Sequence, residues 1–267
     1  MRSIHALAVL AAVALPAVAQ TNWKLVWSDE FNGPAGTAPD PAKWTYDLGA
    51  SGWGNRELEN YTNSRDNSFQ DGSGNLVIRA IKSDATYTSA RLKTQGLYSV
   101  TYGKIEGRLQ IPYGQGIWPA FWMLGDNSRA RGWPAIGEID IMENIGKEPS
   151  TVHGTVHGPG YSGGNGIGKP HGLAAGKRFA DDFHVYSVVW TPDSLEFFVD
   201  GTSYHKLDKT GIPAGTTWAF DHPFFMILNV AVGGQWPGFP DATTTFPQQM
   251  KVDYIRVYQS DSAAAQK

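Results

Sequence analysis

The chain has 267 residues, no cysteine, 18% charged residues and a formal net charge of −3 at pH 7. The lack of cysteine excludes disulfides, thiol catalysis and cysteine-ligated zinc, and the slightly acidic balance argues against nucleic acid or an anionic membrane as a partner. Aromatic residues make up 12% of the chain, including 10 tryptophans, and their flat faces suit both core packing and stacking on sugar rings.

Residues 1–20 differ in composition from the rest of the chain. Arg2 precedes the apolar run ALAVLAAVAL, which is too short to span a bilayer, and AVA at 17–19 has the small residues of a cleavage site. This order predicts a secretory signal peptide over 1–20, and therefore a protein of the periplasm or the extracellular space. A buried N-terminal helix is the alternative.

The remaining chain has the pattern of short β-strands. Alternating or β-branched and aromatic runs predict strands, in chain order, at 75–82, 103–113, 184–191, 224–234 and 250–259. Asp200-Gly201 divides residues 195–207 into two strand-like halves, which predicts a hairpin. We therefore expect a single all-β domain over 21–260, built from two packed antiparallel sheets, with a frayed tail at 261–267.

The hexapeptide EIDIME places Glu138, Asp140 and Glu143 in an otherwise apolar stretch. A helix would spread the three acids around its axis, whereas a regular strand would put only Glu138 and Asp140 on one face. One extra residue near Ile141 or Met142, a β-bulge, would return Glu143 to that face. The hexapeptide therefore predicts a bulged strand with three carboxylates in a row.

Two carboxylates on one face are the groups that a retaining glycosidase needs. The side chains of Glu138 and Glu143 can lean inward over the shorter Asp140, to the separation of about 5 to 5.5 Å at which one acid attacks the sugar and the other moves the proton. A neighbouring negative charge helps the acid to keep its proton. A solvated acidic face and a calcium site made of the same oxygens are the alternatives.

Five segments together resemble glycoside hydrolase family 16, in the bulged form of its catalytic strand found in bacterial laminarinases, which are endo-β-1,3-glucanases. They are LVWSDEFNG (25–33), WGNRELENYT (53–62), GIWPAFWML (116–124), GEIDIMENIG (137–146) and VDYIRVYQ (252–259). The resemblance implies a β-jelly-roll sandwich with a substrate cleft across its concave sheet. It also implies Glu138 as the nucleophile, Glu143 as the general acid and base, and Asp140 as the assisting acid.

Six further residues are similar to substrate-binding residues of that family. They are Asn55, Arg91, Trp118, Trp122, His157 and Trp236. Trp118 and Trp122 are four residues apart, so a strand puts both on one face, where they would floor the sugar subsites or, alternatively, pack in the core. Asn55 and Arg91 resemble residues that hydrogen-bond sugar hydroxyls, against the alternative of turn or surface roles. His157 resembles a histidine near the scissile bond, and Trp236 is expected to border the cleft.

The resemblance also implies a structural calcium on the convex face, and no cofactor for catalysis. The implied calcium ligands are Glu30, a backbone carbonyl near Gly74 and the side chain of Asp253. Oxygen ligands suit calcium, and such an ion would stabilise an exported protein that has no disulfides. The alternative for Asp253 is a cap or an ion pair at the sheet surface.

The sequence therefore predicts a secreted endo-β-1,3-glucanase that hydrolyses internal linkages of β-glucan with retention of configuration. We expect it to act as a monomer, with β-glucan polysaccharide as its partner. Two alternatives stay open. Family relatives with the same motif cleave mixed-linkage β-1,3-1,4-glucan, agar, carrageenan or xyloglucan, and the same sandwich can bind β-glucan as a module without cutting it.

Overall fold

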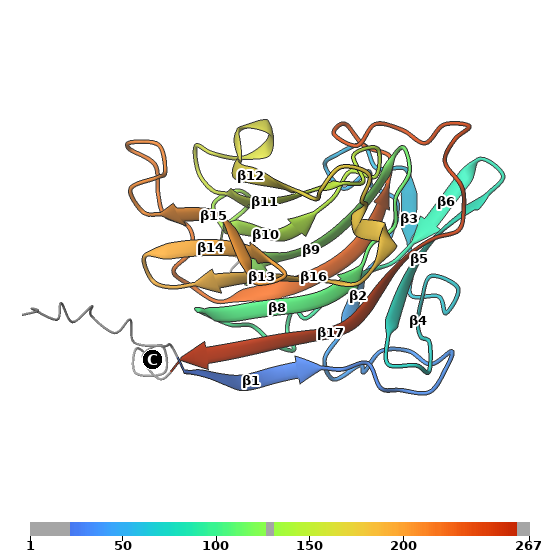
Figure 1. Ribbon diagram of the computed structural model, residues 1–267, viewed down its shortest axis with the longest axis horizontal. Helices are drawn as coiled ribbons and strands as arrows, with labels where there is room; N and C mark the ends of the chain where they lie inside the picture. The colour runs from blue at the N-terminus through green and yellow to red at the C-terminus, as the bar shows by residue number, and fades with distance from the viewer. Residues whose placement is uncertain (1–21, 127–130, 261–267) are drawn as a thin grey trace, which may run out of the picture.

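Two β-sheets pack face to face in the computed structural model, which describes residues 22–126 and 131–260 (Figure 1). The predicted signal peptide at 1–20 and the predicted tail at 261–267 lie outside the described residues. Within the described ranges, no helix is long and apolar enough to cross a membrane. The single domain over 21–260 stays a prediction.

The larger sheet has ten strands. They are β1 (Trp23–Asp29), β3 (Glu59–Tyr61), β4 (Ser68–Gln70), β5 (Leu76–Ser83), β6 (Thr86–Ser89), β8 (Gly103–Gln110), β13 (His184–Trp190), β14 (Ser194–Val199), β15 (Thr202–Asp208) and β17 (Gln248–Ser260). Their order is β15-β14-β13-β8-β17-β5-β6-β3, with β1 paired to β17 and β4 paired to β5. The edge pair β3 and β6 is parallel, and this short pair departs from the predicted antiparallel arrangement.

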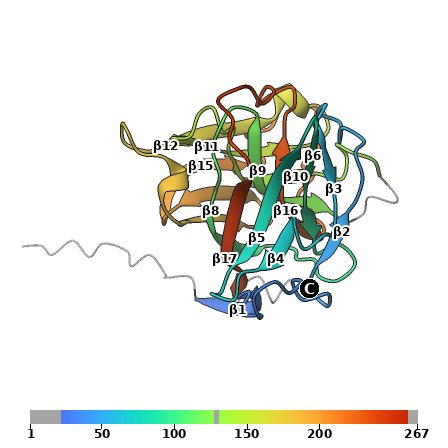
Figure 2. The ribbon, with the colours of Figure 1, turned by 90° about the vertical axis from the view of Figure 1, so that its right-hand side faces the viewer.

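The smaller sheet has seven strands, all paired antiparallel in the order β12-β11-β10-β9-β16-β7-β2. The strands are β2 (Thr45–Asp47), β7 (Arg91–Lys93), β9 (Ile117–Gly125), β10 (Glu138–Glu143), β11 (Thr151–His157), β12 (Ile167–Gly172) and β16 (Phe224–Val232). Two single 3₁₀ turns, η1 (Gly163–Asn165) and η2 (Phe179–Asp181), are the helical elements of the described chain. In Figure 2, β12 lies at one side of the molecule and β2 at the other.

The strands predicted from the alternating runs are confirmed. The five runs correspond, in chain order, to β5, β8, β13, β16 and β17. The predicted hairpin joins β14 to β15, and Asp200 and Gly201 at its tip have φ angles of 49° and 78°. Positive φ at both central residues is the mark of the type I′ turn, whose twist matches that of the flanking strands.

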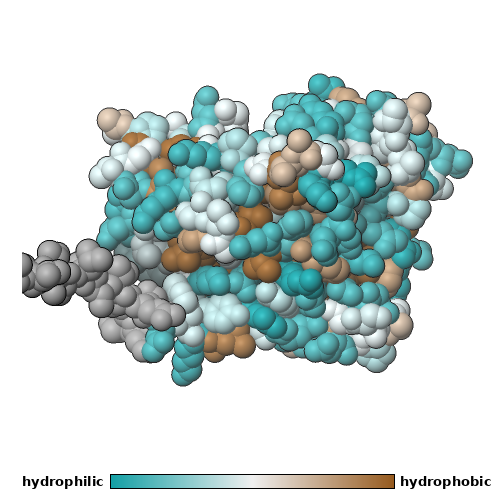
Figure 3. Space-filling view, viewed as in Figure 1, coloured by the Kyte–Doolittle hydropathy of each residue, from teal (hydrophilic) through white to brown (hydrophobic). Residues whose placement is uncertain are grey.

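The hydrophobic core lies between the sheets and follows from side-chain alternation. In β11, Val152 and Val156 are fully buried between the sheets, whereas His153, Thr155 and His157 alternate with them and are partly exposed. Successive side chains of a strand point to opposite faces, so each strand supplies both the core and an outer face. On the face shown in Figure 3, hydrophilic side chains surround a smaller number of hydrophobic ones.

The predicted β-bulge is present in β10. Asp140 pairs with Trp122 of β9, and Met142 pairs with the adjacent residue, Phe121, so Ile141 is the extra residue on this side. The register with β11 shifts over the same stretch. A bulge of this kind changes which face the following side chains occupy. The residues after the bulge are therefore turned over relative to a regular strand.

Candidate active site

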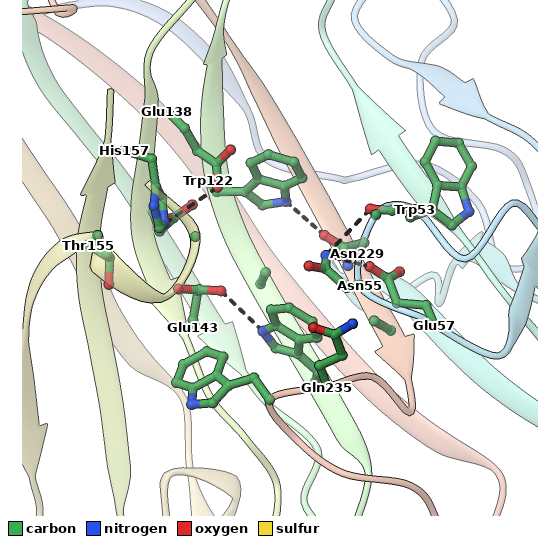
Figure 4. A pocket seen from close by; sticks show the side chains of 18 of the residues that line it. Trp53, Asn55, Glu57, Trp122, Glu138, Glu143, Thr155, His157, Asn229 and Gln235 are labelled. Carbon is green, nitrogen blue, oxygen red and sulfur yellow. Dashed lines mark hydrogen bonds and ion pairs between the residues drawn. The ribbon is translucent and has the colours of Figure 1, made fainter. Parts of the chain in front are cut away.

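A cleft of about 860 Å³ lies on the outer face of the seven-stranded sheet, where β9, β10, β11 and β16 supply lining side chains (Figure 4). The polar and aromatic side chains in its lining are Trp53, Asn55, Glu57, Arg91, Trp118, Trp122, Trp133, Glu138, Asp140, Glu143, Thr155, His157, Asn229, Gln235 and Trp236. All nine residues predicted from the sequence as catalytic or substrate-binding are among them.

The bulge in β10 brings the three acids together on the cleft face. Glu138, Asp140 and Glu143 all line the cleft, while the three apolar residues between them are at most 1% exposed and pack in the core. Glu143 is five residues from Glu138, so a regular strand would have turned it into the core. The alternative of a solvated acidic face does not fit, because Asp140 is only 2% exposed.

Burial and mutual repulsion make these carboxyl groups hard to ionise. Burial, followed by the charge of Asp140, raises the pKa of Glu138 to about 8. Burial also raises the pKa of Asp140 to about 8. Burial, followed by the charges of Asp140 and Glu138, raises the pKa of Glu143 well above its ordinary value. Because the three groups interact, they titrate as a set that holds protons at neutral pH.

The acid cluster opposes folding as the pH rises. Its glutamates bind protons more tightly in the folded chain than in the unfolded chain, where a Glu carboxyl ionises near 4.5. The folded state therefore loses free energy of unfolding as the pH rises from about 4.5 towards about 8. Groups that destabilise the fold in this way are typical of functional sites.

Glu138 is surrounded by donors that favour its ionised form. Trp133 Nε1 donates a hydrogen bond to Glu138 Oε2 at 2.7 Å. His157 lies directly across from Glu138 on β11, with Nε2 3.8 Å from Glu138 Oε1 and 3.1 Å from Asp140 Oδ2. The charge of His157 and the N–H of Trp133 both lower the pKa of Glu138 against the effect of burial. The site can therefore hold a charged Glu138.

Glu143 lies beside an aromatic wall. Trp118 Nε1 donates to Glu143 Oε1 at 3.1 Å, and Trp236 meets Trp118 edge-on with ring centroids 5.6 Å apart. Trp122, on the same face of β9 as Trp118, pairs with Asp140 of the neighbouring strand. Both β9 tryptophans thus line the cleft and do not belong to the core. The two tryptophans thus lie beside the acids on the cleft face.

Arg91 contacts the rings of two tryptophans. Its guanidinium carbon lies 4.7 Å from the ring centroid of Trp53 and 4.7 Å from that of Trp122. Its Nε also lies 3.0 Å from Asp47 Oδ2. The two cation–π contacts and the ion pair with Asp47 restrict the orientation of the guanidinium. Arg91 lines the cleft, as predicted, and its guanidinium also contacts Trp53, Trp122 and Asp47.

Sequence reasoning missed six polar or aromatic residues of the cleft: Trp53, Glu57, Trp133, Thr155, Asn229 and Gln235. Trp53 and Glu57 lie two residues before and after Asn55, in the segment WGNRELENYT that carries the resemblance. The Nδ2 of Asn55 donates to Glu57 Oε1 at 3.0 Å. Trp133 comes five residues before Glu138. Asn229 has the clearest overlooked signal, because it is the only polar side chain of the apolar strand β16.

The residues implied as calcium ligands do not form a free cation site. Both carboxylate oxygens of Glu30 accept hydrogen bonds from Arg256, at 3.0 and 2.7 Å. Asp253 pairs with Arg108 at 2.7 Å, which is the alternative that the sequence left open. Gly74 lies in the turn before β5, with a φ of +87°. The two acids thus have arginine partners in this arrangement.

The acid row itself does not suit calcium. Among the residues that the structure describes, one set of three acidic or histidine side chains lies close enough to share an ion, namely Glu138, Asp140 and His157, with ligand atoms within 4.8 Å of one another. Calcium takes six to eight oxygen ligands, and this set offers two carboxylates and an imidazole. The alternative of a calcium site at the acid row is therefore not supported.

Comparison with known proteins assigns the chain to a family. The family described as "Glycosyl hydrolases family 16" matches residues 55–256. The chain belongs to this family. The match extends from Asn55 at one side of the cleft, through the bulged strand, to β17 of the opposite sheet. This family 16 protein is therefore a glycoside hydrolase, as the acid row predicts.

Relatives of this family 16 protein share both sequence and fold. A beta-glucanase of Rhodothermus marinus is 44% identical over 251 residues, which cover 89% of this chain and 85% of the relative. The catalytic domain of an endo-1,3-beta-glucanase (laminarinase) from Thermotoga petrophila RKU-1 has a TM-score of 0.85 and 50% identity, covering 91% of this chain and all of that one. An endo-beta-1,3-glucanase from Pyrococcus furiosus has a TM-score of 0.85 and 49% identity, covering 90% of this chain and 95% of that one. These likenesses confirm the predicted jelly-roll sandwich.

We expect Trp133→Phe to shift the pH dependence of this glycoside hydrolase. The substitution keeps an aromatic ring but removes the N–H that lowers the pKa of Glu138, so that pKa rises. If Glu138 reacts in its ionised form, the acid limb of the kcat/KM profile moves to higher pH. At a pH on the acid limb, kcat/KM of the variant should be about tenfold lower than that of the wild type, because a hydrogen bond to a charged group is worth about 1.5 kcal/mol.

The matched control is Trp218→Phe, since the Nε1 of Trp218 is buried without a hydrogen-bond partner among the described residues and does not line the cleft. Its pH profile should match the wild type. An unchanged acid limb in Trp133→Phe would show that this N–H does not control the ionisation of Glu138.

Proposed function

We propose that this enzyme is an endo-acting β-1,3-glucanase that cleaves internal linkages of β-glucan with retention of configuration. The observation that carries the proposal is the bulged strand β10, which aligns Glu138, Asp140 and Glu143 in a tryptophan-lined cleft. The tryptophan faces suit stacking against pyranose rings. The Thermotoga and Pyrococcus structures, at 50% and 49% identity, are of endo-1,3-β-glucanases, which supports the linkage.

Glu138 is proposed as the nucleophile. It attacks the anomeric carbon and forms a covalent glycosyl-enzyme while the glycosidic bond breaks. The hydrogen bond from Trp133 and the nearby His157 favour the charge that this attack requires. Asp140 lies between the two glutamates in sequence, and an oxygen of its carboxyl lies within 4.8 Å of one of Glu138. The charge of Asp140 helps to raise the pKa of Glu138, and we propose that these two carboxyls share a proton.

Glu143 is proposed as the general acid and base. Its raised pKa keeps the proton that it donates to the leaving glycosidic oxygen. Once Glu138 is esterified, its charge is gone, and that charge is one cause of the raised pKa of Glu143. The pKa of Glu143 therefore falls in the glycosyl-enzyme, which suits the removal of a proton from the attacking water.

Glu138→Gln and Glu138→Ser test the nucleophile. Neither side chain can form the glycosyl-enzyme as a carboxylate does, so turnover of laminarin should fall by about 10³-fold or more. Thermal unfolding and calorimetric binding of a laminari-oligosaccharide should show an intact fold and site, because one buried charge is removed without loss of volume in Glu138→Gln. Turnover close to that of the wild type would exclude Glu138 from this role.

Glu143→Ala tests the acid and base. Loss of the proton donor should abolish activity on polysaccharide, whereas substrates with a good leaving group still form the glycosyl-enzyme. Azide, which needs no base, should then restore part of the turnover and give a β-glycosyl azide. Rescue should be absent in Glu138→Gln, which serves as the control. No rescue in Glu143→Ala on an activated substrate would contradict its assignment.

The linkage is tested by a panel of polysaccharides. Laminarin, curdlan, lichenan, agarose and xyloglucan are incubated with the purified enzyme, and the products are sized over time. The proposal expects the fastest turnover on laminarin, with oligosaccharides of several lengths appearing early. Preference for lichenan would favour the mixed-linkage alternative, and binding to β-glucan without products would favour the non-catalytic module.

We further propose that the protein is exported after cleavage near residue 20 and acts as a monomer on its polysaccharide, without a nucleic-acid or membrane partner. The pattern of Arg2, the apolar run and the small residues at 17–19 supports export. N-terminal sequencing of protein recovered from the periplasm and the medium tests the cleavage and the compartment. Light scattering of the purified enzyme tests the monomer.

A structural calcium stays a prediction of the family resemblance. To bind, the ion would replace Arg256 and Arg108 as partners of Glu30 and Asp253. If calcium binds, adding it should raise Tm and a chelator should lower Tm. At a calcium concentration of 100 times the dissociation constant, the free energy of unfolding should rise by about 2.7 kcal/mol. Asp253→Asn should remove this response. Equal Tm values in calcium and chelator would leave the ion pairs as the stabilising contacts.

A further inference from the structure

A chain of hydrogen bonds runs behind the cleft from its floor to its wall. Trp122 Nε1 donates to Asn229 Oδ1 at 2.8 Å, and Asn229 Nδ2 donates to the hydroxyl of Tyr61 at 3.1 Å. The hydroxyl of Tyr61 in turn donates to Glu57 Oε2 at 3.0 Å. Figure 4 shows the two ends, with Trp122 near the middle of the cleft and Glu57 at the side away from Glu138.

Every donor in this chain points the same way. The indole N–H of Trp122 has no acceptor capacity, so it fixes the amide of Asn229 with its oxygen towards Trp122 and its nitrogen towards Tyr61. The hydroxyl of Tyr61 accepts from that nitrogen and therefore directs its own proton to Glu57. A reversal of any one group would place two donors against each other. The orientation of one end of the chain thus determines that of the other.

Within the chain of hydrogen bonds, Tyr61 does not face the cleft, whereas Asn229 lines it. Tyr61 is 1% exposed and is absent from the cleft lining, and Asn229 is 6% exposed. Tyr61 belongs to β3 of the larger sheet, whereas Asn229 and Trp122 belong to β16 and β9 of the smaller sheet. The hydroxyl of Tyr61 therefore links a wall segment carried by one sheet to the cleft floor built on the other.

The backbone around Tyr61 has independent anchors. The carboxylate of Glu59 accepts from the N–H of Val232 at 2.6 Å, and the N–H of Leu58 donates to the carbonyl of Val232 at 2.8 Å. The ring of Tyr61 packs edge-on against Trp53, with centroids 5.4 Å apart. Removal of the Tyr61 hydroxyl alone should therefore leave β3 in place.

We propose that Tyr61 is a positioning residue that, through Asn229, holds the ring of Trp122 and the carboxylate of Glu57 in the mutual orientation required to bind one stretch of the sugar chain. Trp122 pairs across the strands with Asp140, so the orientation that Tyr61 sets is that of the floor beside the catalytic acids. The inference rests on the proposed function, because it takes a polysaccharide as the ligand. The ordered contact surface lowers the entropy lost when the chain binds.

The test is Tyr61→Phe, which removes one hydroxyl and keeps the ring. The polysaccharide is the one that the wild type cleaves fastest, so a failure of the β-1,3-glucanase proposal is seen with the wild type and does not bear on Tyr61. We expect KM to rise about three- to tenfold, as one lost hydrogen bond allows, with kcat within about twofold of the wild type. In the Glu138→Gln background, the dissociation constant of an oligosaccharide should rise by the same factor.

The matched control is Tyr186→Phe. Tyr186 is fully buried on β13, and its hydroxyl has no hydrogen-bond partner among the described residues. This variant should keep the KM and kcat of the wild type. A KM within twofold of the wild type in Tyr61→Phe, or an equal change in the control, would overturn the proposal, as would a fall in kcat with KM unchanged.

A second variant covers the case in which Tyr61→Phe fails to fold. Asn229→Ser breaks the same chain of hydrogen bonds from β16 and should raise KM in the same direction. When both single variants fold, the double variant should lose little more than either one, because the two residues act through one link. Fully additive effects of the two changes on KM would show that they act separately and would overturn the proposal.

Discussion

The active site depends on the parity of side chains along one central strand. In β10, a single extra residue decides whether Glu143 faces the cleft with Glu138 or enters the core with the isoleucines. With the second glutamate at position 143, the bulge is what corrects its parity, since the side chains of a regular strand alternate between the two faces. Trp122 of β9 and His157 of β11 pair with fixed positions of β10, and Trp118 of β9 donates to the side chain of Glu143, so one backbone irregularity orders these contacts.

The cleft combines two opposing influences on its acids. Burial and like charge favour the protonated forms of Glu138 and Glu143, whereas nearby N–H groups from Trp133 and Trp118 favour the ionised forms. Each glutamate has one indole donor, but Glu143 is acted on by two acidic neighbours. The difference in the roles proposed for the two glutamates is one of surroundings, because their side chains are chemically identical.

Patterns that are local in the sequence were predictable, and contacts between distant segments were not. Alternation gave the strands, Asp200-Gly201 gave the hairpin, and the spacing of Glu138 and Glu143 required the bulge. The arginine partner of Glu30 is 226 positions away, and no local signal indicates it. The same holds for the contacts of Arg91 with two tryptophans, which depend on how a loop and two strands meet.

The position of β10 inside its sheet has a consequence for how the enzyme loses activity. The strand is paired on both sides, to β9 and to β11, and its inner face is packed in the core. Strands of this kind exchange their amide protons last and separate only when the domain unfolds as a unit. The strand that carries the three carboxyl groups therefore does not unfold on its own, and heat should abolish catalysis and tertiary structure in the same step.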